Sequence, residues 1–194
     1  MLQKKEMIYR HILERYFQAK EISFTQLELS ERFGVSLSTV SNALAPLREM
    51  AMIEVKTRGF VLLDAKKLLL FFATVRTMAK DRIYATRFEA PVQEIERLMP
   101  SDVVFTAYSA YRLAYNDAAA DYSEVYVYAT QDTLAEIKKR FPPRDGPQNV
   151  IVLEADPFIS KGRVSPPQLF ADLWNVGSWY AKEFLDALEK RLFP

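Results

Sequence analysis

Short polar side chains and one arginine gather on one side of a helix predicted over residues 37–48. They lie opposite to its apolar stripe and comprise Ser38, Thr39, Ser41, Asn42 and Arg48. An Asn amide can pair with an adenine edge through two hydrogen bonds, Ser and Thr hydroxyls bond to bases or phosphates, and Arg suits phosphate or guanine. This set of side chains therefore predicts a helix that reads the groove of double-stranded DNA.

The residues before this helix carry the signals that would position it. Thr25 and Glu28 form a capping box at the start of a helix that runs to Phe33, and Gly34 suits the sharp turn that follows. Ser36 can then cap the next helix, whose inward stripe comprises Val40, Ala43, Leu44 and Leu47. The segment resembles the helix-turn-helix family, which favours DNA binding over the alternative of a three-helix packing unit with a solvated third helix.

Pro46 lies well inside the predicted groove-reading helix. Because proline removes a backbone donor, we expect a kink, or the end of the regular helix, near Ala45. Arg48 lies beyond that point and is therefore a weaker candidate for DNA contact than Ser38 to Asn42.

Two β-prone runs follow at the spacing of a winged helix. Residues 52–55 and 60–63 are separated by KTRG, in which Gly59 suits the turn and Lys56 and Arg58 lie at the tip. In a winged helix these two cations would contact phosphate or enter the minor groove. Residues 1–64 are thus predicted to form a winged helix-turn-helix domain.

A further helix precedes this motif. Its apolar stripe comprises Tyr9, Ile12, Leu13, Tyr16 and Phe17, with Arg10, Glu14 and Gln18 expected on the opposite, solvent side. His11 lies beside the stripe, and we interpret it as a surface or half-buried structural residue. It is the single histidine of a chain without cysteine, which excludes thiolate and multi-histidine metal sites.

Charge divides the chain into two parts. Residues 1–80 carry 13 Lys and Arg against 8 Asp and Glu, a net charge of +5, whereas residues 81–194 carry 13 against 17, a net charge of −4. A basic first part fits a nucleic-acid-binding module, because phosphate attraction supplies most of the sequence-independent affinity. The longest apolar run, Leu68 to Ala73, is far below the roughly 18 residues of a membrane span. With no signal-peptide pattern at its start, the chain is expected to be soluble and cytoplasmic.

The second part alternates helix and strand signals. Residues 65–81 are predicted to form a linker helix with a wide apolar arc, which is also a candidate dimer surface. Residues 82–194 then predict an α+β domain. Its expected elements are a helix over 92–98, a strand over 103–107, a helix from Ser109, a strand over 125–129, a helix over 131–140, a strand over 150–153 and two final helices, the first capped by Ser165.

The order of strand, serine-containing turn, helix and strand with an acidic residue resembles the small nucleotidyltransferase fold. Catalytic members of that fold carry Gly-Ser and then Asp-x-Asp, whose carboxylates hold two magnesium ions. Here the turn contains Ser109 after Tyr108, and the strand begins with Glu124 but has Tyr126 in place of the second carboxylate. Since a neutral phenol is a poor magnesium ligand, the site is predicted to be degenerate, with no metal, cofactor or catalytic residue.

A more specific resemblance covers nearly the whole chain. The stretch TAYSAYRLAYNDAAADYSEVYVYAT, followed by VSPPQLFADLWNVGSWYAKEFLDAL, resembles the effector domain of the AbiEi-like regulators, the antitoxin-type winged-helix proteins of abortive-infection systems. The resemblance implies a DNA-binding repressor, often acting on its own promoter, whose nucleotidyltransferase-like domain has lost catalysis. A cognate toxin or an effector ligand is a further partner that it suggests, although no residue shows either.

These signals together predict a homodimeric, sequence-specific transcription regulator that is not an enzyme. The DNA-binding set is Ser36, Ser38, Thr39, Ser41, Asn42, Arg48, Lys56 and Arg58. Two alternatives stay open: a magnesium-dependent nucleotidyltransferase whose winged domain binds the substrate, and an interaction module whose winged helix binds protein.

Overall fold

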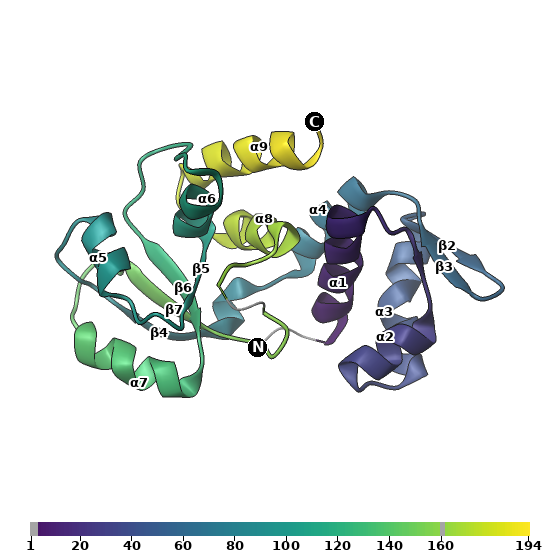
Figure 1. Cartoon of the computed structure of the whole chain (residues 1–194), viewed down its shortest axis with the longest axis horizontal. Coiled ribbons are helices and arrows are strands. Elements are labelled where there is room, and N and C mark those ends of the chain that lie inside the picture. The colour runs from purple at the N-terminus through teal and green to yellow at the C-terminus, as the bar shows by residue number, and fades with distance from the viewer. Residues whose placement is uncertain (1–3, 160–161) are drawn as a thin grey trace. The chain divides into compact units, whose positions relative to one another are not determined.

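The computed structural model describes residues 4–159 and 162–194. The chain divides into two compact units, the first extending to Arg76 and the second running from Thr77 to Pro194 (Figure 1). This division differs from the predicted one, in which residues 65–81 were a linker. The helix after the wing packs against the first helix and so belongs to the first unit.

Helices form the body of the first unit: α1 (Lys4–Ala19), α2 (Gln26–Phe33), α3 (Leu37–Glu49) and α4 (Ala65–Val75). Helix α1 contacts all three of the others, and its middle turns form the centre of the core. The helix predicted over 65–81 is shorter than expected, because α4 ends at Val75 and a separate 3-10 turn, η1 (Met78–Asp81), follows in the second unit.

The position of α1 between other helices corrects two predictions about its faces. Arg10, expected in solvent, is only 2% exposed and pairs with Glu14 at 3.7 Å. Tyr16 and Phe17, expected in the core, are half-buried near the end of the helix and pack edge-to-face on each other. Because helices pack on more than one side of α1, its middle turns are buried over a wider arc than one apolar stripe covers. The last turn of α1 is only partly covered.

The turn between α2 and α3 follows the sequence signals closely. Thr25 caps α2 by accepting a hydrogen bond from the Glu28 amide, and Gly34 ends the helix in the left-handed conformation, with φ of 57°. Ser36 caps α3 by accepting from the Thr39 amide at 3.2 Å. The predicted inward stripe of α3 is buried throughout.

Pro46 does not end α3 near Ala45 as expected. The helix continues to Glu49, and the Met50 amide still bonds to the Pro46 carbonyl at 3.1 Å. The proline removes only the hydrogen bond that its own nitrogen would have donated. Burial of Leu47 in the following turn stabilises the helix beyond that point.

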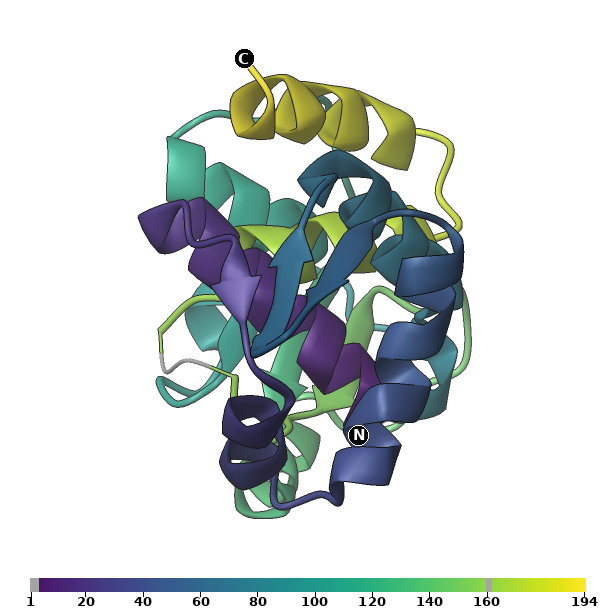
Figure 2. The same cartoon turned by 90° about the vertical axis from the view of Figure 1, so that its right-hand side faces the viewer.

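A small antiparallel sheet completes the first unit. Its order is β1 (Ser23–Phe24), β3 (Gly59–Leu62), β2 (Ile53–Lys56), and the hairpin of β2 and β3 is the predicted wing. In Figure 2 the two blue strands of this hairpin can be followed to their connecting loop. The sequence did not predict β1, because two residues carry no periodicity.

The second unit is built on a mixed sheet of order β4-β7-β6-β5. Its strands are β4 (Arg82–Thr86), β5 (Val104–Thr106), β6 (Val125–Ala129) and β7 (Val150–Glu154). Strands β6 and β7 are parallel, and the other two pairings are antiparallel. Strand β4 was not predicted, since its side chains are only half-buried and show no clear alternation.

Helices cover both faces of this sheet. Helices α5 (Val92–Leu98) and α7 (Gln131–Arg140) pack on the face that carries the odd-numbered residues of β6. Helix α6 (Ala107–Tyr115) packs on β5 and β6 and on α8 (Pro166–Asn175), which in turn contacts α9 (Ala181–Leu192) (Figure 1). The mixed α+β class predicted for the chain is confirmed.

The start of α6 and the cap of α8 differ from the prediction. Helix α6 begins at Ala107 rather than Ser109, directly after β5, and Ala107 itself has a positive φ of 49°. Ser165 occupies the N-cap position of α8 with Pro166 at N1, as expected, but its hydroxyl makes no capping hydrogen bond. The residue at N2 is Pro167, which has no amide hydrogen to donate to the Ser165 hydroxyl.

Gly59 is the position in the wing that tolerates no side chain. Its φ is 135°, and a Cβ atom would lie 2.2 Å from the Phe24 carbonyl oxygen. We expect Gly59→Ala to lower the stability of the first unit by at least about 2 kcal/mol, through backbone strain and steric overlap. Native-state hydrogen exchange of the β2 and β3 amides measures this change.

Gly34→Ala is the matched control. Gly34 also has a positive φ, of 57°, but no heavy atom lies within 4 Å of the position of its Cβ. Its substitution should therefore cost only the left-handed backbone penalty of about 1 kcal/mol. Equal losses for the two variants would contradict the close contact between Gly59 and β1.

Candidate nucleic-acid interface

Helix α3 is held in the first unit by contacts on its inner side. The Tyr9 hydroxyl donates to the Ala43 carbonyl at 2.8 Å within the core, which ties α1 to the middle of α3. The Ser30 hydroxyl donates to the Val35 carbonyl at 2.5 Å, and the Val35 amide donates back to the Ser30 carbonyl at 3.1 Å. These bonds fix the conformation of the turn before α3 and the orientation of the helix in the unit. The outer face of α3 therefore has a defined direction.

A cluster of hydroxyls occupies the first turn of α3. The Ser36 Oγ lies 2.8 Å from the Ser38 Oγ and 2.9 Å from the Thr39 Oγ1, besides accepting from the Thr39 amide. Ser36, predicted to contact DNA, is therefore engaged first as a helix cap. The cluster adds hydrogen-bonding groups at the helix N-terminus, where the backbone dipole favours phosphate.

The outer face of α3 carries the predicted polar residues. Ser38, Ser41, Asn42 and Arg48 are exposed, whereas Thr39 is half-buried because its hydroxyl turns back to the cap. Since the helix continues through Pro46, Arg48 remains on the same helical surface as Ser41. That these side chains contact DNA remains a prediction.

A shallow groove lies between α3 and the small sheet. Its floor is apolar, from Leu44, Ile53 and Phe60, and its polar rim consists of Gln26, Ser41 and Arg48. Gln26 is the first residue of α2 and was missed by the sequence reasoning. The only sequence signal at Gln26 is its place in the first turn after a capping residue. This place does not show that Gln26 lines the same groove as α3.

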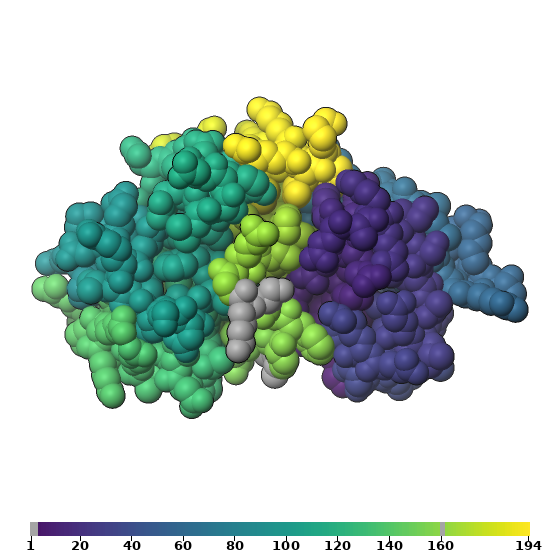
Figure 3. Space-filling view, viewed as in Figure 1, coloured from purple at the N-terminus to yellow at the C-terminus, as the bar shows by residue number. Residues whose placement is uncertain are grey.

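The wing presents one exposed cation at its tip. Strand pairing ends at Lys56 and Gly59, so Thr57 and Arg58 form the loop, which stands clear of the helices of its unit (Figure 3). Lys56, predicted at the tip, lies in β2 and forms an ion pair with Glu54 at 2.6 Å. No ion pair with Arg58 is found among the described residues, which makes it the stronger of the two candidates for the predicted phosphate contact.

His11 is more deeply buried than predicted. Its ring packs edge-to-face on Phe33 at 5.7 Å, and its Nε2 has no hydrogen-bond partner among the described residues. Burial, followed by the charges of Arg32, Arg15 and Arg10, lowers the pKa of His11 to about 4. The ring is therefore neutral near pH 7 and acts as a structural contact between α1 and α2.

The residues of the second predicted site make contacts within the second unit. Ser109 is fully buried in α6, and its hydroxyl has no hydrogen-bond partner among the described residues. Glu124 accepts hydrogen bonds from the hydroxyls of Ser178, at 3.1 Å, and Tyr180. Across residues 4–159 and 162–194, no group of three His, Cys, Asp or Glu side chains could hold a metal ion.

Tyr126 lies beside this carboxylate and stays protonated. Burial, followed by the negative charge of Glu124, raises the pKa of Tyr126 to about 12. The ring packs edge-to-face on Tyr108, which is itself fully buried. A half-buried tyrosine that stays neutral near pH 7 therefore occupies the position at which the sequence lacks the predicted second carboxylate.

A buried carboxylate lies at the junction of α8 and the sheet. Asp172 accepts from the hydroxyls of Thr106 and Tyr128, each at 2.7 Å, and from the Gln168 amide at 2.8 Å. Gln168 also donates to the Tyr128 hydroxyl at 3.0 Å. The side chains come from β5, β6 and α8, so this network fastens the helix to the sheet.

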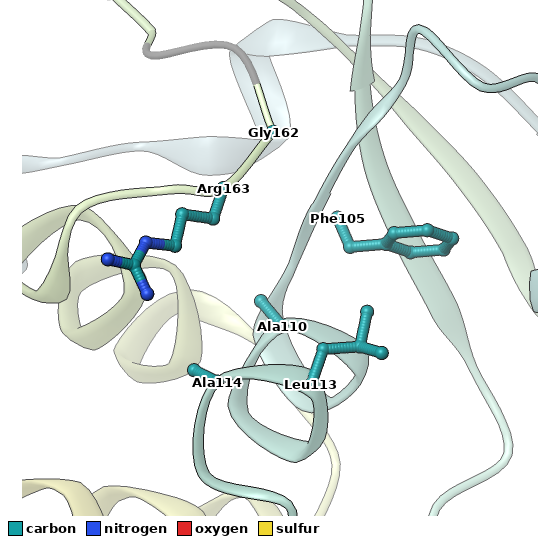
Figure 4. A pocket seen from close by; sticks show the side chains of 6 residues that line it. All are labelled: Phe105, Ala110, Leu113, Ala114, Gly162 and Arg163. Atoms are coloured by element: carbon teal, nitrogen blue, oxygen red, sulfur yellow. The ribbon is translucent and has the colours of Figure 1, made fainter.

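A second hollow lies in the second unit, between β5, α6 and the segment that precedes α8 (Figure 4). The side chains that line it are apolar apart from one arginine, and its lining comprises Phe105, Ala110, Leu113, Ala114, Gly162 and Arg163. A single exposed guanidinium does not define the chemistry of a ligand, so no binding site is assigned to it.

Comparison with known proteins gives one match, which lies in the first unit. Residues 7–71, which run from α1 into α4 and make up about a third of the chain, match the Crp-like helix-turn-helix domain. This match supports a DNA-binding regulator. No curated protein and no solved structure matches the chain. Among the described helices, none is long and apolar enough to span a bilayer.

The burial of neutral His11 predicts acid sensitivity of the first unit. Its pKa is lower in the folded state, about 4, than the value of 6.5 expected when unfolded, so the unfolded chain binds the proton more tightly. Stability is therefore lost as the pH falls from 6.5 towards 4, by about 2 kcal/mol between pH 7 and pH 5. Hydrogen exchange of the α1 amides, corrected for intrinsic rates, measures the loss.

Two controls accompany this measurement. His11→Gln should remove most of the pH dependence between pH 7 and pH 5, whatever its own stability. The second unit contains no histidine and serves as an internal reference within the same samples. A first unit whose stability does not change between pH 7 and pH 5 would contradict the buried, neutral state of His11.

Proposed function

We propose that the chain is a sequence-specific DNA-binding transcription regulator that acts as a repressor and regulates its own operon. The observation that carries the proposal is the capped helix α3, which presents exposed Ser38, Ser41 and Asn42 in its first two turns within a region that matches the Crp-like helix-turn-helix domain. Helix-turn-helix proteins place the N-terminal residues of their second helix against base edges in the major groove.

The contacts divide into those that read bases and those that bind the backbone. Asn42 is the residue best suited to an adenine edge, and Ser38 and Ser41 suit bases or phosphates. Arg58, at the wing tip, and Arg48, near the end of α3, carry the charge that phosphate attracts. Lys56 contributes less in this arrangement, because Glu54 partly neutralises it.

A homodimer on a palindromic or repeated site follows from the size of the module. A single DNA-binding module buries only about 600–1,000 Å² of protein surface on DNA, which limits its affinity and specificity. A two-fold symmetric dimer doubles these contacts and spaces two α3 helices about one helical turn of DNA apart.

Substitutions of the two best-placed residues test the interface. Asn42→Ala should weaken binding to a preferred duplex by about 1–3 kcal/mol and relax the preference at one base pair. Arg58→Ala should weaken binding to all sequences alike and reduce the slope of log K against log salt by about 1. Fluorescence anisotropy with a labelled duplex from the chain's own upstream region, against a scrambled duplex at several salt concentrations, measures both.

Arg97→Ala is the control for loss of charge, since Arg97 is an exposed arginine on α5 of the second unit. It should leave both affinity and salt dependence unchanged. Unaltered affinity in Asn42→Ala and Arg58→Ala would show that this face does not bind DNA. Weak binding of both duplexes by the wild-type chain would reduce α3 to a helix that contacts only the backbone.

For the second unit we propose a nucleotidyltransferase-like effector domain without catalysis. The order β5-α6-β6-α7-β7, the internal bonds of Glu124 and the neutral Tyr126 support this proposal. The AbiEi-like architecture inferred from the sequence has the same arrangement, and its inactive domain would serve regulation rather than phosphoryl transfer.

Glu124→Gln separates this proposal from a magnesium-dependent nucleotidyltransferase. We expect no magnesium-dependent nucleotide transfer from nucleoside triphosphates by the wild-type chain. The variant should instead lose about 1–2 kcal/mol of stability in the second unit, because the carboxylate accepts from Ser178 and Tyr180. Tryptophan fluorescence in urea reports this unit, which contains both Trp174 and Trp179. Nucleotide transfer that the substitution abolishes would establish the enzyme instead.

A further inference from the structure

One exposed apolar side chain interrupts the polar face of α3. Leu37, the first residue of the helix, is 50% exposed, whereas its neighbours Ser36 and Ser38 are polar and exposed. The inward stripe of the helix does not include it, and the sequence reasoning did not assign it a role. An exposed leucine alone is ordinary, but this one lies at the start of the helix that is proposed to enter the major groove.

Leu37 is held at the position where recognition helices approach bases. The cap of Ser36 on the Thr39 amide and the hydroxyl contacts of Ser36 with Ser38 and Thr39 fix the turn that carries it. Helical spacing places Ser41, Ala45 and Arg48 on the same side of α3 as Leu37. The row of side chains therefore begins with the branched apolar Leu37, whereas Ser41 and Arg48 in the same row suit bases and phosphates.

We propose that Leu37 reads thymine through an apolar contact with its C5-methyl group in the major groove. This inference rests on the proposed function and adds a base that none of the polar residues selects. The thymine methyl is the apolar group that the major groove presents, and it marks thymine against the other bases. Contact with the methyl group would remove the exposed part of Leu37 from water and so gain free energy from apolar burial. Contact of Leu37 with a polar base edge would gain less free energy.

The test uses the full chain and the tightest duplex recovered by selection from a randomised pool. Each thymine of that duplex is replaced in turn by deoxyuridine, which keeps base pairing and lacks only the methyl group. Fluorescence anisotropy should show that the wild-type chain loses about fourfold in affinity at one thymine of a half-site, the loss expected for one buried methyl group.

Leu37→Ala should bind the thymine and deoxyuridine duplexes equally at that position. Leu63→Ala is the matched control, because Leu63 is 55% exposed and follows β3, away from α3 in the sequence. It should keep the fourfold discrimination of the wild-type chain. Alanine suits the first turn of a helix, and unchanged thermal unfolding by circular dichroism would show that Leu37→Ala is folded.

Two results would overturn the inference while leaving the proposed function intact. One is a preferred duplex in which no thymine is sensitive to loss of its methyl group. The other is a Leu37→Ala chain that discriminates thymine from deoxyuridine as well as the wild type, which would place Leu37 outside the groove. A pool that yields no preferred duplex would overturn the proposed function together with this inference, so the two failures are distinguishable.

Discussion

The turn between α2 and α3 is the constraint on which the DNA-binding face depends. Gly34 takes a left-handed conformation, Ser30 and Val35 exchange two hydrogen bonds across the turn, and Ser36 caps the helix that follows. These bonds satisfy backbone groups that a sharp reversal would otherwise leave unpaired. Because the turn is fixed locally, the direction of α3 does not depend on its own exposed residues, which are then available for recognition.

The core of the first unit secures this geometry from behind. The Tyr9 hydroxyl reaches the backbone of α3, and the ring of His11 packs on Phe33 at the end of α2. The close approach of Gly59 to Phe24 brings the wing against the strand that leads into α2. The helix and the wing are therefore both positioned by the same short segment, which holds the two elements proposed to contact DNA in a fixed arrangement.

The second unit uses its polar residues differently. Asp172 and Glu124 each accept several hydrogen bonds from side chains on neighbouring elements, and neither joins a cluster of acidic residues in the described part of the chain. Asp172 is fully buried and Glu124 half-buried, and a carboxylate removed from water in this way needs such donors to offset the loss of hydration. Such a unit is suited to transmit or support regulation, in keeping with the inactive nucleotidyltransferase-like domain proposed for it.

Local signals in the sequence determined most elements of the first unit. The capping residues, the turn glycine, the inward stripe of α3 and the two strands of the wing act over a few residues, so their physical causes are visible in one dimension. The same holds for α5, α7 and β6 in the second unit, whose predicted bounds agree with the structure. The outward position of Asn42 and Ser41 also follows from helical periodicity alone.

Tertiary structure decided what depends on contacts between distant residues. Strands β1 and β4 are too short or too evenly buried to show a pattern, and they form because β3 and β7 offer them partners. The burial of Arg10 and His11, the pairing of Lys56 with Glu54 and the continuation of α3 past Pro46 arise from neighbours that periodicity does not specify. Helical periodicity in the sequence thus predicted which residues are candidates for DNA contact, whereas packing decided which of these candidates are exposed and which are engaged with neighbouring residues.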